Sequence, residues 1–358
     1  MSTPRHVDID ITSKCNLRCK YCYYFDDTNH QYIDLPTDEW LKFFDELGRL
    51  HVMDVNLAGG EPFSRPDLKT LLTGIVDNRM RFGLLSNGAL INDDIARFIN
   101  ETGRCNSVQI SLDSSHPETH DSCRGKGAFD GAVRGIRTLQ RHDINIDIRV
   151  TLHHRNIDDL EDTARFILED LGLPQFSTNA AGYLGTCQSH SSEIQLTIED
   201  RARAMRILET LDQRYPGRLS ATAGPMSDSR MWKRMIDAHE RHLPAYGGFL
   251  TGCGCTFTSL AVLSDGKIVP CIMLPQIECG RINRDDLGEV WRTSPHLTAL
   301  RSRREIPLKS FEECSGCPFA PYCTGNCPSL AYAHYQSIDL PSPDACLKRY
   351  LEEGGIIP

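Results

Sequence analysis

The segment HVDIDITSKCNLRCKYCYYF, residues 6–25, begins with the pattern of a β-strand and continues into a loop that carries three cysteines. In HVDIDI, apolar and polar residues alternate, as they do in strands. Cys15, Cys19 and Cys22 follow within eight positions. A four-iron cluster held entirely by protein takes four thiolates, so this loop alone is one ligand short. Either the fourth ligand comes from a distant part of the chain, or one iron is left open.

Strand and helix patterns alternate through the first half of the chain. Besides residues 6–11, the strand candidates are 54–60, 81–88, 107–113, 144–152 and 175–181. Helix candidates lie at about 37–50, 66–79, 92–102, 129–142, 157–171 and 197–214. Such alternation predicts a parallel sheet with right-handed crossovers, and six units are too few for a complete eight-fold barrel. We therefore expect an α/β fold, an open partial (β/α)6 barrel whose active edge lies at the carboxyl ends of the strands.

The composition suits a soluble globular protein. The 358 residues carry a formal net charge of −9, which argues against a nucleic-acid ligand because that would favour a basic stripe. The N-terminus shows neither a secretory nor a transit signal, and no apolar run approaches the ~18 residues of a membrane span. We expect a cytoplasmic protein with no membrane partner. Disulfides are rare in that compartment, so the regular grouping of 15 cysteines indicates metal ligands or catalysts rather than scattered buried thiols.

The character of the sequence changes after about residue 250. Short strands, turns and a second set of cysteines replace the alternation there. We expect three parts: a partial-barrel core at 1–185, a helical connector at 186–250 and a small cysteine-rich domain at 251–358.

The first cysteine loop, C-x3-C-x2-C with Tyr21 directly before the last cysteine, resembles that of the radical S-adenosylmethionine (SAM) superfamily. In that family the three thiolates hold a [4Fe-4S] cluster, and the methionine part of SAM chelates the fourth iron. The resemblance implies reductive cleavage of SAM to a 5′-deoxyadenosyl radical that abstracts a hydrogen atom from the substrate. A structural zinc knuckle is the alternative, but zinc sites favour paired C-x2-C motifs or mixtures of cysteine and histidine.

Further marks of this family stand at the ends of the predicted strands. AGGEP (58–62) resembles the family's GGEP, whose backbone and glutamate contact the amino group of SAM, and its glycines allow a close approach. SNG (86–88) and ISLD (110–113) end the next two strands. Arg124 lies in a segment resembling the one whose arginine meets the SAM carboxylate, which a guanidinium can bind bidentately. The contacts to SAM implied by the resemblance are Tyr21, Gly59, Gly60, Glu61, Pro62, Ser86, Asn87, Ser111, Asp113 and Arg124.

Seven cysteines of the C-terminal part match the SPASM extension of radical SAM enzymes, which commonly holds two auxiliary [4Fe-4S] clusters with interleaved ligands. The resemblance therefore implies three clusters in all, together with SAM. One auxiliary cluster would be held by Cys314, Cys317, Cys323 and Cys346. The other would take Cys255, Cys271 and Cys327, with Cys253, Cys279 or an open iron that binds a substrate thiolate as the fourth position. A zinc ribbon is the alternative for 314–327, but it does not account for the cysteines outside that run.

SPASM proteins mostly act on peptides or proteins, so the resemblance implies a maturase of a ribosomally made peptide. The reaction we expect is an oxidative intramolecular cross-link, a carbon–carbon or thioether bond. The expected partners are the peptide, a reductase such as flavodoxin or ferredoxin, and a separate leader-binding protein, since no leader-binding domain fits before the first strand.

Other activities stay open at this point. They are a peptide or sugar epimerase or dehydrogenase, an enzyme like the anaerobic sulfatase maturases, and a non-catalytic electron-transfer protein. Sulfatase maturases carry an acidic residue directly after the cysteine that Cys271 matches, where this chain has Ile272. An epimerase needs a thiol that returns a hydrogen atom, and Cys187, which follows the sixth strand, is the candidate. The alternative for Cys187 is an idle thiol.

Overall fold

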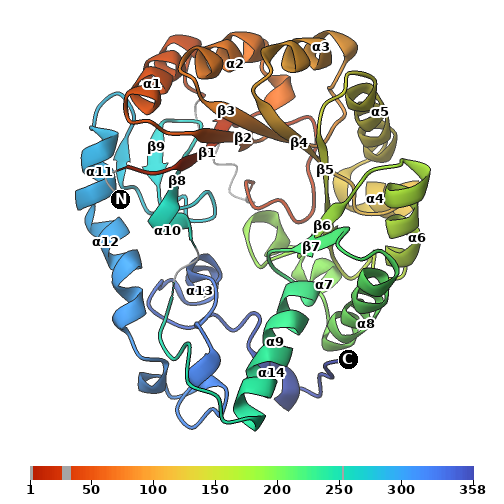
Figure 1. The fold of residues 1–358 in the computed structure, drawn as a ribbon, viewed down its shortest axis with the longest axis vertical. Helices are drawn as coiled ribbons and strands as arrows, with labels where there is room; N and C mark the ends of the chain where they lie inside the picture. Colours follow the sequence, from red (N-terminus) through yellow and green to blue (C-terminus); the bar gives the residue numbers. More distant parts are fainter. Residues whose placement is uncertain (1–2, 26–33, 252–253) are drawn as a thin grey trace.

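The computed structural model describes residues 3–25, 34–251 and 254–358. Its centre is a ten-stranded sheet in the order β10-β9-β8-β1-β2-β3-β4-β5-β6-β7 (Figure 1). From β1 to β7, each strand pairs in parallel with the next one along the chain, which gives an open partial barrel. The strands are β1 (His6–Thr12), β2 (Asp54–Gly59), β3 (Arg81–Ser86), β4 (Cys105–Ser111), β5 (Ile146–Leu152), β6 (Phe176–Ala180), β7 (Leu219–Ala221), β8 (Ser259–Val262), β9 (Lys267–Val269) and β10 (Gly280–Arg281).

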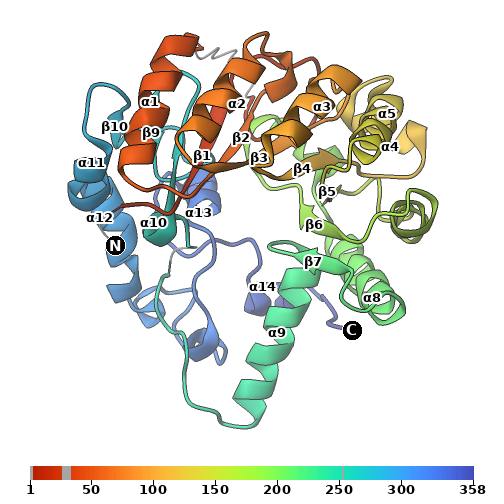
Figure 2. The ribbon, with the colours of Figure 1, turned by 45° about the horizontal axis from the view of Figure 1, so that its top comes forward.

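Helices surround the barrel strands and continue into the C-terminal part. They are α1 (Thr37–Arg49), α2 (Leu68–Asp77), α3 (Asp93–Thr102), α4 (Pro117–Arg124), α5 (Ala128–Arg141), α6 (Leu160–Arg165), α7 (Ser191–Ile194), α8 (Ile198–Arg214), α9 (Pro225–Glu240), α10 (Cys255–Thr258), α11 (Leu287–Thr293), α12 (Pro295–Ser302), α13 (Pro328–Tyr335) and α14 (Leu347–Glu352). Figures 1 and 2 show α1, α2, α3 and α5 on the outside of the curved sheet. Their inward stripes are apolar, and α1 for example buries Trp40, Phe43 and Phe44.

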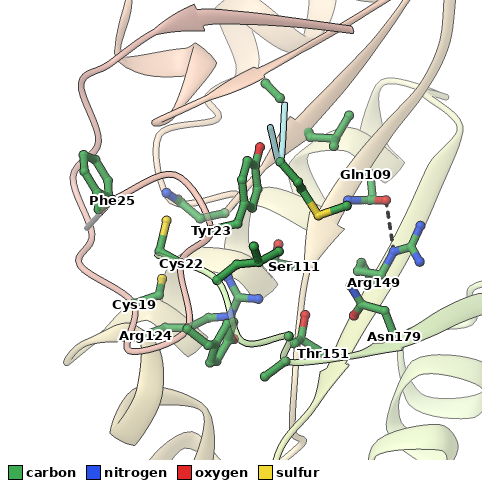
Figure 3. Close-up of a pocket in the computed structure, with 18 of the residues that line it drawn as sticks. Cys19, Cys22, Tyr23, Phe25, Gln109, Ser111, Arg124, Arg149, Thr151 and Asn179 are labelled. Atoms are coloured by element: carbon green, nitrogen blue, oxygen red, sulfur yellow. Dashed lines mark hydrogen bonds between the residues drawn. The ribbon is translucent and has the colours of Figure 1, made fainter. Parts of the chain in front are cut away.

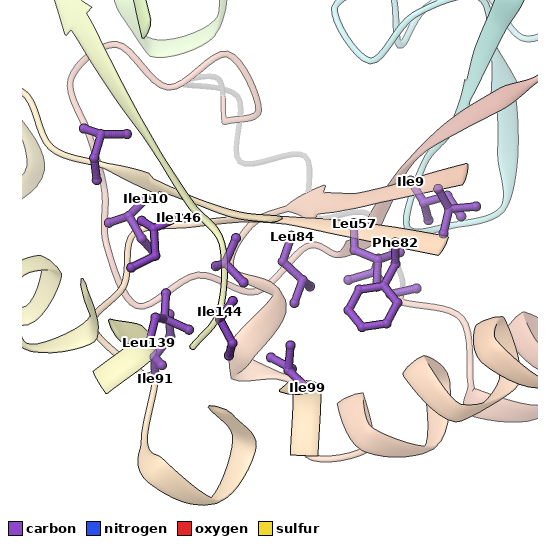
Figure 4. Close-up of a cluster of buried hydrophobic side chains, with 14 of the residues drawn as sticks. Ile9, Leu57, Phe82, Leu84, Ile91, Ile99, Ile110, Leu139, Ile144 and Ile146 are labelled. Atoms are coloured by element: carbon purple, nitrogen blue, oxygen red, sulfur yellow. The ribbon is translucent and has the colours of Figure 1, made fainter. Parts of the chain in front are cut away.

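The two faces of the barrel strands carry different side chains. On the inner face, Gln109 of β4, Arg149 of β5 and Asn179 of β6 line a cavity (Figure 3). On the outer face, apolar side chains such as Leu57 and Leu84 belong to the main hydrophobic core beneath the helices (Figure 4). Because side chains alternate along a strand, the same strands build a dry core on one side and a polar chamber on the other.

The expected fold class is correct. Each predicted strand and helix is present, with ends that differ by three residues or fewer. The helix predicted at 157–171 is α6 followed by a π-helical turn over Phe166–Asp170. α4 was not predicted, because eight residues that begin with a proline give too short a periodic signal.

Strands from all three expected parts of the chain share one sheet. Residues Ser259–Val262 of β8 pair in parallel with His6–Ile9 of β1, and β9 and β10 continue the sheet in antiparallel fashion. At the opposite edge, β7 lies within the segment predicted as a helical connector. The alternation along the chain could not show this, because it reports local structure and not which distant strands pair.

The last part of the chain, which includes α14, lies away from β1–β3 and packs against α9 (Figures 1 and 2). There, Trp232 and Met235 of α9 form a second apolar cluster with Tyr322, Leu347 and Tyr350. This packing fixes the cysteine-rich segment relative to the barrel. Among the described residues, no helix combines the length and the apolar character that a membrane crossing requires.

Candidate active site

The loop that follows β1 carries three thiols that lie close together. Burial raises the pKa of Cys15, Cys19 and Cys22, that of Cys22 to about 11. The charge of a neighbouring thiolate in the loop raises the pKa of Cys15 and Cys22 further. A positive partner is needed to hold all three as thiolates at neutral pH. Iron supplies such a charge, so this donor set fits an iron–sulfur cluster with three protein ligands.

A turn after β6 and the end of α4 fasten the cysteine loop. The Cys22 N–H donates to the Thr186 hydroxyl at 2.9 Å, and the Thr186 N–H donates to the Cys22 carbonyl at 3.0 Å. The same hydroxyl donates to the Cys19 carbonyl at 2.9 Å. On the other side, the Lys20 N–H donates to the Cys123 carbonyl at 2.9 Å. Sequence reasoning missed Thr186, because a single hydroxyl residue in a loop carries no pattern of its own.

Gly59 and Gly60 let the end of β2 pass close to the cysteine loop. A Cβ at Gly59 would lie 2.4 Å from the Thr12 carbonyl oxygen, and one at Gly60 would lie 2.1 Å from that of Lys14. The Gly60 N–H donates to the Thr12 carbonyl at 2.8 Å. The resemblance explains these glycines by a close approach of the backbone to SAM. The structure adds a second reason, which lies within the protein. The backbone of the cysteine loop itself occupies the space of a side chain.

We expect Gly60→Ala to displace the cysteine loop, because the new methyl group would overlap the Lys14 carbonyl group. The result would be a loss of about four irons per chain, the content of one cluster. The measurement is iron analysis after anaerobic reconstitution. Gly172→Ala is the control: its φ is +65°, but its Cβ would meet no atom within 4 Å. Full iron content in the Gly60 variant would contradict this account of the loop.

Glu61 joins the end of β2 to the end of β3. Its carboxylate accepts hydrogen bonds from the Ser86 hydroxyl and the Asn87 N–H, both at 2.8 Å, and from the Phe63 N–H at 3.2 Å. Burial raises the pKa of Glu61 to about 7, while these donors oppose the shift. Pro62 begins the short 3-10 turn that follows and is buried. Glu61 therefore positions two strand ends, and its predicted contact with SAM stays a prediction.

A buried ion pair stands directly behind the cysteine loop. The Arg124 Nε donates to Asp113 Oδ2 at 2.6 Å and its Nη2 donates to Oδ1 at 3.2 Å. The Tyr21 hydroxyl donates a hydrogen bond to the same carboxylate, and the Tyr21 ring lies against the Arg124 guanidinium. The Thr151 N–H donates to Asp113 Oδ1 at 2.9 Å. Burial alone would raise the pKa of Asp113, but the Arg124 charge outweighs it and holds the pKa below its usual range. Arg124 is predicted to bind the SAM carboxylate, and the structure shows that Asp113 already holds two of its nitrogens.

A cavity of about 480 Å³ opens beside the cysteine loop at the carboxyl ends of the strands (Figure 3). The C-terminal part contributes Met273, Cys327 and Leu330 to its wall. Eight of the ten predicted SAM contacts line it: Tyr21, Gly59, Gly60, Glu61, Ser86, Asn87, Ser111 and Arg124. Pro62 and Asp113 do not. Asp113 acts through Arg124 and Tyr21, so its prediction as a direct contact is not supported by the geometry.

Cys187 lies outside the cavity. Its side chain is fully buried in a small apolar cluster with Cys123 and Ile194, packed against Tyr21 and Ala181. Burial raises the pKa of the Cys187 thiol to about 11. The sequence placed this thiol at the mouth of the barrel, but the neighbouring Thr186 turns the segment so that it fastens the cysteine loop instead. The structure thus corrects the placement on which a hydrogen-donor role was based.

Four thiols gather in the C-terminal part. Burial and the charges of the other three raise the pKa of Cys314, to about 11. Burial, together with the charges of Cys346 and Cys317, raises the pKa of Cys323, and burial and the charge of Cys317 raise that of Cys346. These four residues are the ones that the resemblance assigns to one auxiliary cluster. Cys314, Cys317 and Cys323 are close in the chain, and the loop before α14 brings Cys346 to them.

The other auxiliary set is spread over separate elements. Cys255 begins α10, the Met273 N–H donates to Cys271 Sγ at 3.5 Å, and the Cys327 thiol lies 2.9 Å from the Ser329 hydroxyl. Cys279 packs against the main core, where burial raises its pKa to about 11, Ser294 and Arg301 oppose the shift, and no thiol of the described residues contributes to it. Cys253 lies outside the described residues. Among the described residues, no three cysteine, histidine or carboxylate side chains are placed to hold a single metal ion. An iron–sulfur cluster does not require such a group, because each thiolate binds its own iron.

Comparisons with known proteins agree with this geometry. The sequence profile of the radical SAM superfamily matches residues 9–167, and that of an iron–sulfur cluster-binding domain, SPASM, matches residues 253–318. The AdoMet-dependent heme synthase of Methanosarcina barkeri is 27% identical over 340 residues, 93% of each chain. The antilisterial bacteriocin subtilosin biosynthesis protein AlbA of Bacillus subtilis is 24% identical over 337 residues, 90% of this chain and 67% of that protein.

A solved structure shares the fold across nearly the whole chain. SuiB of Streptococcus suis bound to its precursor peptide SuiA superposes with a TM-score of 0.75 at 16% identity, covering 97% of this chain and 76% of that one. The matched profiles, the cysteine loop beside the cavity and this fold lead to one conclusion. The protein is a radical SAM enzyme with a C-terminal SPASM domain, and it belongs to the group whose members use iron–sulfur clusters and SAM.

Proposed function

We propose that this enzyme matures a ribosomally made peptide by an oxidative intramolecular cross-link. The observation that carries the proposal is the shared wall of the cavity: Cys327, a predicted auxiliary-cluster ligand, lines the same space as Cys15, Cys19 and Cys22. An oxidative reaction needs an electron acceptor close to the substrate, and this arrangement supplies one opposite the site of SAM cleavage.

We propose three [4Fe-4S] clusters for this chain. Cys15, Cys19 and Cys22 would hold the cluster that binds SAM, and the two sets of the C-terminal part would hold the auxiliary clusters. When bound, the first cluster and SAM supply a 5′-deoxyadenosyl radical, fed by an electron from a flavodoxin or ferredoxin type of reductase. The chain's own contribution is to shape a cavity in which one substrate carbon faces that radical and water is excluded.

A peptide fits the size of the cavity. Its volume of about 480 Å³ lies in the usual range for a drug-sized ligand, so bound SAM would fill a large part of it. The remaining space suits one or two side chains that enter from outside. The printed names of AlbA and of the SuiB complex support a peptide substrate as well. We propose that recognition of a leader sequence comes from a separate protein.

A tetrapyrrole is the second candidate substrate. The observation in its favour is that the heme synthase of M. barkeri is similar over 93% of each chain. A reaction like that of sulfatase maturases is less well supported. Ile272, at the position of their acidic residue, packs against the apolar cluster of Ala261, Leu263 and Val269.

Cross-linking predicts a product about two mass units lighter than its peptide. The substrate gives one hydrogen atom to the 5′-deoxyadenosyl radical, and it gives one electron and one proton to acceptors as the new bond forms. The measurement is mass spectrometry after co-expression with small peptides encoded next to this enzyme. We expect Cys187→Ala to give the same product, because the thiol is buried away from the cavity.

Epimerisation gives a different result on every count. The product mass would stay unchanged in ordinary water, one solvent deuterium would enter in heavy water, and the Cys187 variant would lose turnover. A mass-neutral product that carries deuterium would overturn the cross-linking proposal. A product formed from a porphyrin and from no peptide would move the assignment to the tetrapyrrole candidate.

A further inference from the structure

The end of the cavity formed by β4, β5 and β6 carries a cationic group without an anionic partner. Arg149 of β5 lines the cavity, and its Nε donates to the Gln109 side-chain oxygen at 3.3 Å. Among the described residues, no carboxylate forms an ion pair with this guanidinium. Burial lowers the pKa of Arg149, and the charge of Asp147 on the same strand opposes the shift. The guanidinium is thus partly desolvated while its binding capacity is largely unused.

A second, independent observation points to a ligand at the same place. The Asn179 side-chain oxygen is buried and has no hydrogen-bond partner in the part of the chain that the structure describes, although Asn179 lines the cavity. A buried polar atom without a partner is unfavourable, unless a ligand or water supplies one. Figure 3 shows Arg149, Gln109 and Asn179 side by side on the three strands. The guanidinium matches the oxygens of a carboxylate, whereas the Asn179 oxygen is an acceptor and matches an N–H of the same ligand, such as a peptide N–H.

We infer that Arg149, with Gln109 beside it, forms a subsite for a carboxylate group of the substrate, and that the Asn179 oxygen accepts a hydrogen bond from a neighbouring N–H of the same substrate. The inference rests on the proposed function and deepens it: the peptide would present an acidic side chain or its C-terminal carboxylate to this end of the cavity. A guanidinium binds such a group through two parallel hydrogen bonds, which fixes orientation as well as position. The substrate carbon would then be held between this subsite and the cysteine loop.

The methionine carboxylate of SAM is the other carboxylate in the reaction, and the geometry places it elsewhere. By the resemblance on which this reading rests, that group chelates the open iron and so stays beside the three cysteines. Figure 3 shows Cys19 and Cys22 on one side of the cavity, Ser111 between, and Arg149 on the far side. The subsite therefore serves the substrate.

The test compares binding of matched probes to the anaerobically reconstituted enzyme in the presence of SAM. The probes are two capped tripeptides, one with a central glutamate and one with a central glutamine, and coproporphyrin III, which carries propionates. Equilibrium dialysis measures the affinity of each. We expect the wild type to prefer the glutamate peptide by about ten- to hundredfold, the range of a charge-assisted hydrogen bond. Arg149→Gln should remove the preference, and Arg149→Lys should keep part of it.

The control is Arg141→Gln, whose guanidinium pairs with Asp93 on the exposed outer helices. This variant should bind all probes as the wild type does, and SAM affinity should be equal in all four proteins. A loss of SAM affinity in Arg149→Gln, or the lack of any preference for carboxylate that depends on Arg149, overturns the inference. If only coproporphyrin III binds in an Arg149-dependent way, the carboxylate subsite stands and the peptide proposal fails.

Discussion

Replacing Cys15, Cys19 and Cys22 together by alanine is expected to abolish 5′-deoxyadenosine formation. These three thiols line the cavity at the strand ends. The other sulfur atoms in the described part of its wall, those of Cys327 and Met273, come from the C-terminal part. Without the three thiols, the cluster that would cleave SAM has no ligands. Because the auxiliary sets lie on other elements, their iron should remain. Iron should fall from about twelve to about eight per chain.

Two measurements check this expectation: iron content after anaerobic reconstitution, and 5′-deoxyadenosine after reduction with dithionite. The control is Cys105→Ala, a half-buried thiol at the start of β4 that packs against the main core. It should keep both the iron and the activity. An iron count near four in the unaltered protein would contradict the presence of two auxiliary clusters. Residual 5′-deoxyadenosine in the triple variant would contradict the assignment of the site of SAM cleavage.

The second large effect is expected from the buried pair of Asp113 and Arg124. Arg124→Ala leaves the Asp113 carboxylate buried with only Tyr21 and the Thr151 N–H as donors. Breaking a buried ion pair by removing one partner costs about 3–5 kcal/mol of unfolding free energy. If Arg124 also binds the SAM carboxylate, SAM affinity should fall in addition by about 1.5–3 kcal/mol.

A set of three variants separates the two roles. Arg124→Ala, Asp113→Ala and the double variant form a cycle, and the double variant should be less destabilised than the sum of the single ones. Thermal unfolding of the reconstituted proteins measures stability, and equilibrium dialysis measures SAM binding. Arg141→Ala, which removes the exposed pair with Asp93, should change neither. Unchanged SAM affinity in a folded Arg124 variant would show that Arg124 only positions the cysteine loop.

The sequence predicted the parts of the site that depend on local pattern. The ligand spacing around Cys15, Cys19 and Cys22 is a property of one loop, and the C-terminal spacing of Cys314, Cys317 and Cys323 is likewise local. The alternation of strand and helix patterns predicted the parallel sheet. Because parallel strands end at one edge of a sheet, it also predicted that the motifs at those ends would meet.

The sequence by itself thus determined the fold class, the cysteine groups and the motif residues at the strand ends beside the cysteine loop. Only the tertiary structure decided how they are held and what else is present: Thr186 fastens the cysteine loop, β8 joins β1, Cys187 turns away from the cavity, and Arg149 forms no ion pair with any described carboxylate. The reason is physical. Periodicity and spacing arise from neighbours in the chain, whereas these features arise from contacts between residues far apart, which depend on strand register and on packing that no local pattern encodes.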